Sequence, residues 1–151
     1  MRKASHTSTP WTRLLGAIHF WSARTHRHYG IVFADRGEFE DAVAEYGRAI
    51  ASNPAMRRAY LERGILYWRE LNQPQRAIAD LTVALEFQPG WPEALFCRGL
   101  AYVAAGDYPE AIRDLDGYIR SDDRAWQASA QSQLSLLRSL TGEALPAGDA
   151  P

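Results

Sequence analysis

Cysteine, lysine and long apolar runs are scarce in this sequence, and each shortage excludes a class of structure. Cys97 is the only cysteine, so the chain cannot form an internal disulfide or a cysteine-based zinc site. The apolar segment 14–21 is interrupted by His19 and falls well short of the ~20 residues that cross a bilayer. Lys3 is the only lysine beside 16 arginines, as is typical of a GC-rich bacterial genome. These features predict a cytoplasmic bacterial protein, with a peripheral membrane or organellar location as the alternatives.

Acidic residues are missing from the start of the chain, because none precedes Asp35. That segment holds five of the 17 basic residues and all four histidines, whereas the remainder holds all 18 acids. The net charge of −1 produces no overall field that would select nucleic acid or membrane. The basic N-terminal segment nevertheless leaves a peripheral membrane-associated or nucleic-acid-associated accessory protein as the alternative function.

Small residues recur at a fixed spacing, which indicates three repeated units. Gly30, Gly64 and Gly99 are 34 and 35 residues apart, and an aromatic residue follows each of them three positions later. Three alanines repeat at the same period: Ala42, Ala77 and Ala111. A glycine inside a helix costs ~1 kcal/mol relative to alanine. Its recurrence at one phase therefore predicts that two helices cross too closely there for a Cβ atom.

Prolines divide each unit into two antiparallel helices. Pro74, Pro92 and Pro109 fall where a helix should start, and Pro54 and Pro89 fall just past a helix end. The chain is therefore predicted to be all-α without any sheet. It would contain eight helices, or seven if the first two are continuous.

The third unit carries the strongest family likeness, in residues 94–102 and 106–112. With the other two units in register, the chain resembles the tetratricopeptide repeat (TPR) family over roughly residues 23–125. The family's first-helix tryptophan is replaced here by His26, Tyr60 and Leu95. The resemblance implies an α-α superhelix, a right-handed solenoid of antiparallel helix pairs with N- and C-terminal capping helices. It also implies a concave face that binds peptides or helices.

The expected organisation follows from these repeats. A flexible N-terminus (1–9) and an N-terminal helix (10–22) precede the units at about 23–56, 57–91 and 92–125. A capping helix (126–140) and a disordered tail (141–151) follow.

The resemblance also implies which residues line the concave face. They are the first-helix residues that avoid the core stripe: Arg24, Arg27, His28, Ile31, Arg58, Leu61, Ile65, Trp68, Arg69, Phe96, Leu100 and Val103. Some relatives clamp a C-terminal carboxylate at positions that here hold Arg27, Ile31, Glu62, Glu93 and Cys97. Only Arg27 suits that task, so a carboxylate clamp of that kind is not expected.

The leading helix admits three interpretations. Its apolar spacing fits a helix that packs against the first unit and caps the open end. Its aromatic surface also fits a partner-contact helix through Trp11, Leu15, Phe20 and Trp21. Flanking Arg13 and Arg24 suit a helix at a membrane surface.

Residues suited to catalysis or metal binding do not form a convincing group. His26 and His28 point ~200° apart on a helix and cannot readily share a metal. Asp114, Asp116 and the pair 122–123 fit a helix surface and a helix end, and Cys97 fits a groove-lining residue better than a nucleophile. The sequence thus predicts a noncatalytic protein–protein interaction module: an adaptor, assembly factor or accessory subunit. It would need no cofactor, metal or small-molecule substrate, and self-association stays open.

Overall fold

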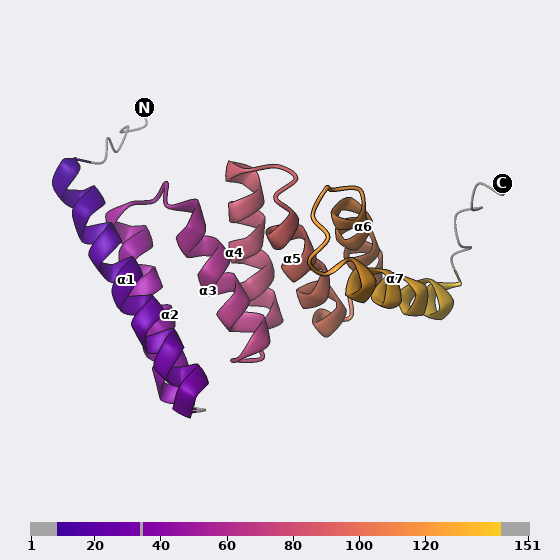
Figure 1. Cartoon of the computed structure of the whole chain (residues 1–151), viewed down its shortest axis with the longest axis horizontal. Coiled ribbons are helices and arrows are strands. Elements are labelled where there is room, and N and C mark those ends of the chain that lie inside the picture. Colours follow the sequence, from indigo (N-terminus) through magenta and orange to yellow (C-terminus); the bar gives the residue numbers. More distant parts are fainter. Residues whose placement is uncertain (1–8, 34, 143–151) are drawn as a thin grey trace, which may run out of the picture.

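The chain folds into a row of antiparallel helices. A computed structural model describes residues 9–33 and 35–142, which contain seven helices and no strand. Successive helices lie side by side, with α1 and α7 at opposite ends of the row (Figure 1). The predicted all-α superhelix is confirmed. The helices are α1 (Pro10–Phe33), α2 (Arg36–Ser52), α3 (Arg57–Arg69), α4 (Pro74–Phe87), α5 (Pro92–Ala105), α6 (Tyr108–Ile119) and α7 (Gln127–Thr141).

The helix boundaries follow from local chemistry. Pro74 and Pro92 are the first residues of α4 and α5, where the missing N–H has no helical acceptor to lose. Asp35 caps α2, because its Oδ1 accepts a hydrogen bond from the Gly37 N–H at 2.8 Å. Gly106 ends α5 at a φ of +85°, a left-handed conformation that favours glycine.

The helices cross closely at the three repeated glycines, as their spacing predicts. A Cβ built on Gly30 would lie 2.7 Å from Phe39 Cε1, and one on Gly64 would lie 2.8 Å from Leu81 Cγ. A Cβ on Gly99 would lie 2.9 Å from Leu115 Cγ. Each glycine of a first helix thus lets a large side chain of the second helix fill the space that a Cβ would need.

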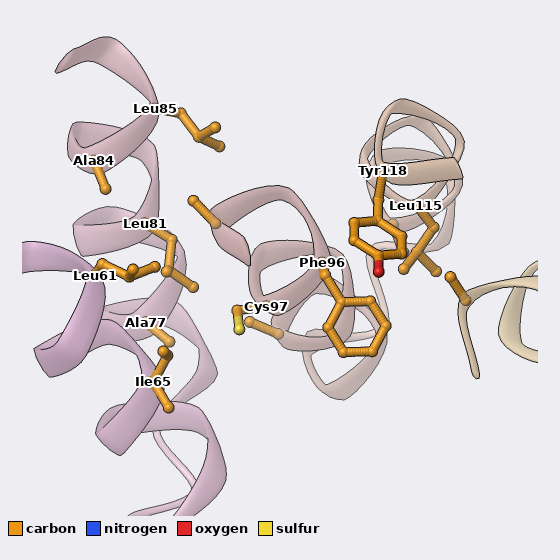
Figure 2. Packing of buried hydrophobic residues seen from close by; sticks show 14 of the residues in the cluster. Leu61, Ile65, Ala77, Leu81, Ala84, Leu85, Phe96, Cys97, Leu115 and Tyr118 are labelled. Carbon is orange, nitrogen blue, oxygen red and sulfur yellow. The ribbon is translucent and has the colours of Figure 1, made fainter. Parts of the chain in front are cut away.

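The core runs along the row between the helices. The repeated alanines Ala42, Ala77 and Ala111 are fully buried, and so are Leu81 and Leu115. Figure 2 shows Leu61, Ile65 and Leu81 gathered between helices and the ring of Phe96 beside Tyr118. Because each unit buries its apolar residues against its neighbours, the described helices stabilise one another in sequence along the row.

An ion pair with a buried carboxylate joins the two helices of the second unit, and an equivalent pair joins the two helices of the third. Arg63 donates to both carboxylate oxygens of Asp80 at 2.7 and 2.8 Å. Arg98 binds Asp114 in the same two-pronged way at 2.6 and 2.8 Å. The sequence-based placement of Asp114 on a solvated helix surface is therefore wrong, since the residue is 4% exposed. Its partner on α5 supplies the compensating charge.

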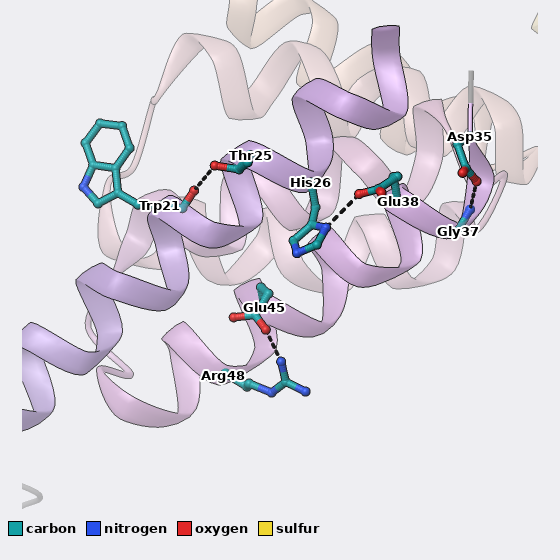
Figure 3. Close-up of polar contacts among 8 residues, drawn as sticks. All are labelled: Trp21, Thr25, His26, Asp35, Gly37, Glu38, Glu45 and Arg48. Atoms are coloured by element: carbon teal, nitrogen blue, oxygen red, sulfur yellow. Dashed lines mark hydrogen bonds and ion pairs between the residues drawn. The ribbon is translucent and has the colours of Figure 1, made fainter. Parts of the chain in front are cut away.

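The leading segment is continuous with the first helix of unit one, which is the seven-helix alternative of the sequence-based prediction. Residues 22–25 contain no proline or glycine that would end a helix, which allows α1 to extend over 24 residues. Its inner side is tied to α2 by His19–Glu45 and His26–Glu38, each with a nitrogen–oxygen distance of 2.7 Å. Figure 3 shows His26 pointing toward Glu38 and Trp21 pointing away from α2.

The far end of the row is covered by α7, which packs on α6. Arg138 of α7 donates to both carboxylate oxygens of Asp116, at 2.8 and 2.7 Å. None of the helices in the described part of the chain combines the length and apolar character of a membrane-spanning segment. The predicted flexible start (1–9) and disordered tail (141–151) fall largely on residues 1–8 and 143–151, which lie outside the described residues, whereas Thr141 is the last residue of α7.

Candidate partner-binding groove

A groove of about 570 Å³ lies along the first helices of the three units. Eight of the twelve residues predicted for the concave face line it, and they come from α1, α3 and α5. They are Arg24, Arg27, Arg58, Ile65, Trp68, Arg69, Phe96 and Leu100. Glu62, Glu93, Cys97, Trp126 and Ser129 complete the lining. The repeat register thus brings residues from three helices of the solenoid into one concavity.

Charged side chains of the groove form a connected network. Glu62 is 5% exposed and accepts from Arg58 Nε at 3.0 Å, while Arg27 Nη1 lies 3.4 Å from it. Arg58 also reaches Glu93 at 3.1 Å. Four arginines and two glutamates give the lining a formal net charge of +2. The two glutamates are therefore neutralised in place, and the excess charge favours a segment with some acidic residues.

The apolar part of the groove lies toward its C-terminal end. The ring of Phe96 stacks on Trp126 with a centroid distance of 5.1 Å and an interplanar angle of 9°. Trp68 is half-buried, and its buried indole Nε1 has no nitrogen or oxygen acceptor among the described residues, only the weak acceptor sulfur of Cys97 nearby. A buried N–H left unpaired costs ~1–3 kcal/mol. A partner that brings a carbonyl oxygen to Trp68 would remove that cost.

Four predicted residues are placed differently. Leu61 is fully buried in the core between α3 and α4, so it cannot contact a partner, and the prediction for it is wrong. Ile31 lines a neighbouring concavity of about 480 Å³ together with Arg27 and Arg69. His28 and Val103 are not among the residues that line either concavity.

Phe96 also differs from the expected exposed anchor. It is 7% exposed, because Trp126 covers its ring, so a partner would meet the edge of this aromatic pair.

Sequence reasoning missed Trp126 and Ser129 as lining residues. Both lie at the start of the expected capping helix, and Trp126 precedes the first residue of α7. The sequence could have indicated these two residues through their position at the start of the capping helix. A capping helix takes the place of a fourth unit's first helix, so its first turn can reach the same concave face.

The residues predicted for a contact helix divide between two sides of α1. Trp11, Leu15 and Trp21 are exposed, at 74%, 49% and 63%. Phe20 instead points inward, where its ring packs edge-on against Tyr46 at 5.6 Å. Phe20 therefore belongs to the packing of α1 on α2, and its assignment to a contact surface is wrong.

One group of side chains has the spacing of a metal site. His26, Glu38 and Asp41 each offer one ligand atom, and these atoms lie within 4.8 Å of one another. The His26–Glu38 pair already joins α1 to α2, and Asp41 is exposed. The packing of the two helices accounts for this arrangement.

Cys97 is expected to be chemically inert in the folded chain. Burial, followed by the negative charge of Glu93, raises the pKa of the Cys97 thiol to about 12. Because the thiolate is the reactive form, iodoacetamide at pH 8 should label the native chain at least about a hundredfold more slowly than the chain unfolded in urea. A mass-spectrometric time course measures both rates, and equal rates would show that Cys97 is accessible and ionised.

Comparison with known proteins agrees with the repeat organisation. The family model described as Tetratricopeptide repeat matches residues 30–94 and 96–136. The FAM10 family protein At4g22670 of Arabidopsis thaliana is 35% identical over 79 residues, which are 52% of this chain and 18% of that protein. The chain spans between 4% and 23% of four such curated relatives. That likeness therefore concerns only a part of each relative.

Solved structures share the same arrangement of helices. The TPR domain of Arabidopsis OM64 superposes with a TM-score of 0.72 at 21% identity, over 83% of this chain and 98% of that one. The first TPR of Spaghetti (RPAP3), solved bound to the HSP90 peptide SRMEEVD, gives a TM-score of 0.67 at 19% identity. That likeness covers 82% of this chain and 95% of the other. At such identities the likeness establishes the fold.

Proposed function

Because this chain belongs to the tetratricopeptide repeat family, we propose that it is a noncatalytic protein-interaction module whose groove binds a segment of a partner protein. The observation that carries the proposal is the pairing of a half-buried Trp68 with a cationic rim in one concavity. A concave site with apolar anchors and a few polar groups suits a peptide or helix. Peptide binding by a neighbour of the same fold supports this assignment. An adaptor, assembly factor or accessory subunit would use the groove in this way.

The groove also suggests the character and direction of the bound segment. Apolar contacts are available at Trp68 and Leu100, whereas Arg24 and Arg27 lie on α1 at the N-terminal end. A segment with an apolar anchor and adjacent acidic residues would place its acidic part toward α1. Glu62 already pairs with Arg27 and Arg58, and Glu93 pairs with Arg58, which disfavours a clamp built around a terminal carboxylate.

Trp68→Ala is expected to weaken binding of such a segment at least about 30-fold, since a central aromatic anchor is worth ~2 kcal/mol or more. Segments would be selected from a phage-displayed peptide library on the whole chain, and their Kd values measured by fluorescence anisotropy. Leu140→Ala is the control, because Leu140 is 63% exposed on α7 and does not line the groove. Thermal unfolding of each variant checks that the fold is kept.

The charged rim should affect mainly the rate of association. Arg69 has a 63% exposed side chain, so Arg69→Ala should slow association and reduce its dependence on salt. Arg58→Ala is a less selective change, because it also removes a partner of Glu62 and Glu93. If selected peptides bind Trp68→Ala like the unaltered chain but fail to bind Trp11→Ala or Trp21→Ala, the groove is not their site.

A further inference from the structure

The side of α1 that faces away from α2 is apolar along its length. Residues seven positions apart lie on one side of a helix, and this side carries Trp11, Ile18, Thr25 and Val32 at that spacing. Trp11, Ile18 and Val32 are 74%, 54% and 56% exposed. The opposite side carries buried small residues at the same spacing: Gly16, Ala23 and Gly30. The helix α1 is therefore built to pack on two sides, and no described helix covers the second side.

Equivalent positions in the later units are covered by a helix. The repeat spacing relates Thr25 of α1 to Ala59 of α3 and to Ala94 of α5. Val32 corresponds in the same way to Leu66 and Ala101, and these four residues of units two and three are at most 1% exposed. They are buried because α2 packs on α3 and α4 packs on α5. The outward side of α1 is thus a seat for a helix of the same kind as α2 or α4.

Charge identifies the kind of helix that fits this seat. The second helices are acidic: α2 has four acids and two arginines, α4 two and one, and α6 three and one. The first helices are less acidic: α1 has three arginines and no acid, α3 four arginines and one acid, and α5 one arginine and one acid. We infer that the outward side of α1 binds an acidic amphipathic helix of another protein, seated as the second helix of a preceding unit would be. Trp11, Ile18 and Val32 do not line the groove, so this side of α1 adds a second docking surface, and Arg24 lies at the border of the two because it also lines the groove.

Neither end helix of a second copy supplies the matching charge. Two copies of α1 would bring together only basic side chains, because neither helix carries an acid. The helix at the other end, α7, exposes Leu136 and Leu140, but its only charged residue is Arg138. Pairing of α1 with α1 or with α7 therefore leaves Arg13 and Arg24 without an acidic partner on the other helix.

The test uses a synthetic helical peptide of three heptads as the probe. Leucine and alanine occupy its seam positions and glutamate the flanking positions, and a matched peptide has lysine in place of glutamate. Fluorescence anisotropy with the whole chain should show at least tenfold tighter binding of the glutamate peptide. Ile18→Glu should weaken that binding at least tenfold. Leu136→Glu should leave it unchanged, because Ile18 and Leu136 are equally exposed at 54%.

The other outcomes each overturn the inference. If the glutamate peptide does not bind, or if the lysine peptide binds equally well, the outward side of α1 does not select an acidic helix. Binding lost in Trp68→Ala but kept in Ile18→Glu would place the peptide in the groove and leave the proposed function standing. Light scattering that shows a dimer dissociated by Ile18→Glu would identify a second copy as the occupant. Flotation with phosphatidylglycerol vesicles that Ile18→Glu abolishes would identify a lipid surface instead.

Discussion

Gly99→Leu is expected to lower the free energy of unfolding by several kcal/mol, about 3 or more. A Cβ at this position would lie 2.9 Å from Leu115 Cγ and 3.5 Å from the Ala111 carbonyl oxygen. Leu115 is fully buried and cannot turn toward solvent, so α5 and α6 would have to move apart. A shift between two helices would also disturb their contacts with neighbouring helices, because every unit is supported by the next. Chemical denaturation followed by circular dichroism measures the change.

A second glycine of the same helix pair provides the control. A Cβ on Gly117 of α6 would meet Leu95 Cδ1 at 3.4 Å, which is close to ordinary contact. Gly117→Ala should therefore be neutral or should stabilise the chain by up to ~1 kcal/mol through its better helix propensity. If Gly99→Leu unfolds like the unaltered chain, the two helices do not cross as closely as the structure has them.

The repeat organisation could be predicted because its signal is local and periodic. Glycines at 30, 64 and 99 mark close crossings, and prolines at helix starts mark boundaries, so neither requires knowledge of distant contacts. Such local signals could not distinguish a separate leading helix from one that is continuous with the first repeat helix. Fusion of 10–22 with the first repeat helix depends on how α1 packs along α2, through pairs such as His19–Glu45.

The groove was harder to predict, because exposure depends on tertiary packing. Leu61 shares the expected concave side of α3 with Ile65 but is drawn into contact with α4, where it is fully buried. Phe96 is covered by Trp126, a residue 30 positions later that belongs to the expected cap. Helical phase places a residue on a side of its helix, but it does not show which neighbouring helix will cover that side.

The sequence also contains a recurring pattern that indicates the ion pairs inside units two and three. An arginine precedes the glycine in units two and three, at Arg63 and Arg98, and a carboxylate follows the repeated alanine by three residues, at Asp80 and Asp114. Each of these residues alone is typical of a solvated helix surface. Only the recurrence of both together, 17 and 16 residues apart, indicates that they pair across the two helices of a unit.

Asp114→Ala is expected to destabilise the chain by ~3–5 kcal/mol, the usual cost of removing one partner from a buried ion pair. Asp114 accepts two hydrogen bonds from Arg98, whose side chain is only 19% exposed. The variant would leave the guanidinium charge partly buried with Thr82 Oγ1 as its remaining acceptor. Denaturant titration measures the loss. Glu40→Ala is the control, because the Arg36–Glu40 pair is about 60% exposed on both sides and such pairs contribute ~0–1 kcal/mol.

A double variant separates the energy of the pair from the cost of an isolated charge. Replacing both partners with apolar residues, Arg98→Met with Asp114→Leu, leaves no buried charge and should recover most of the stability lost in Asp114→Ala. Recovery would show that the pair specifies how α5 and α6 meet more than it stabilises them. If the double variant is instead as unstable as Asp114→Ala, the two-pronged hydrogen bonding of Arg98 contributes net stability, and the equivalent Arg63–Asp80 pair should behave in the same way.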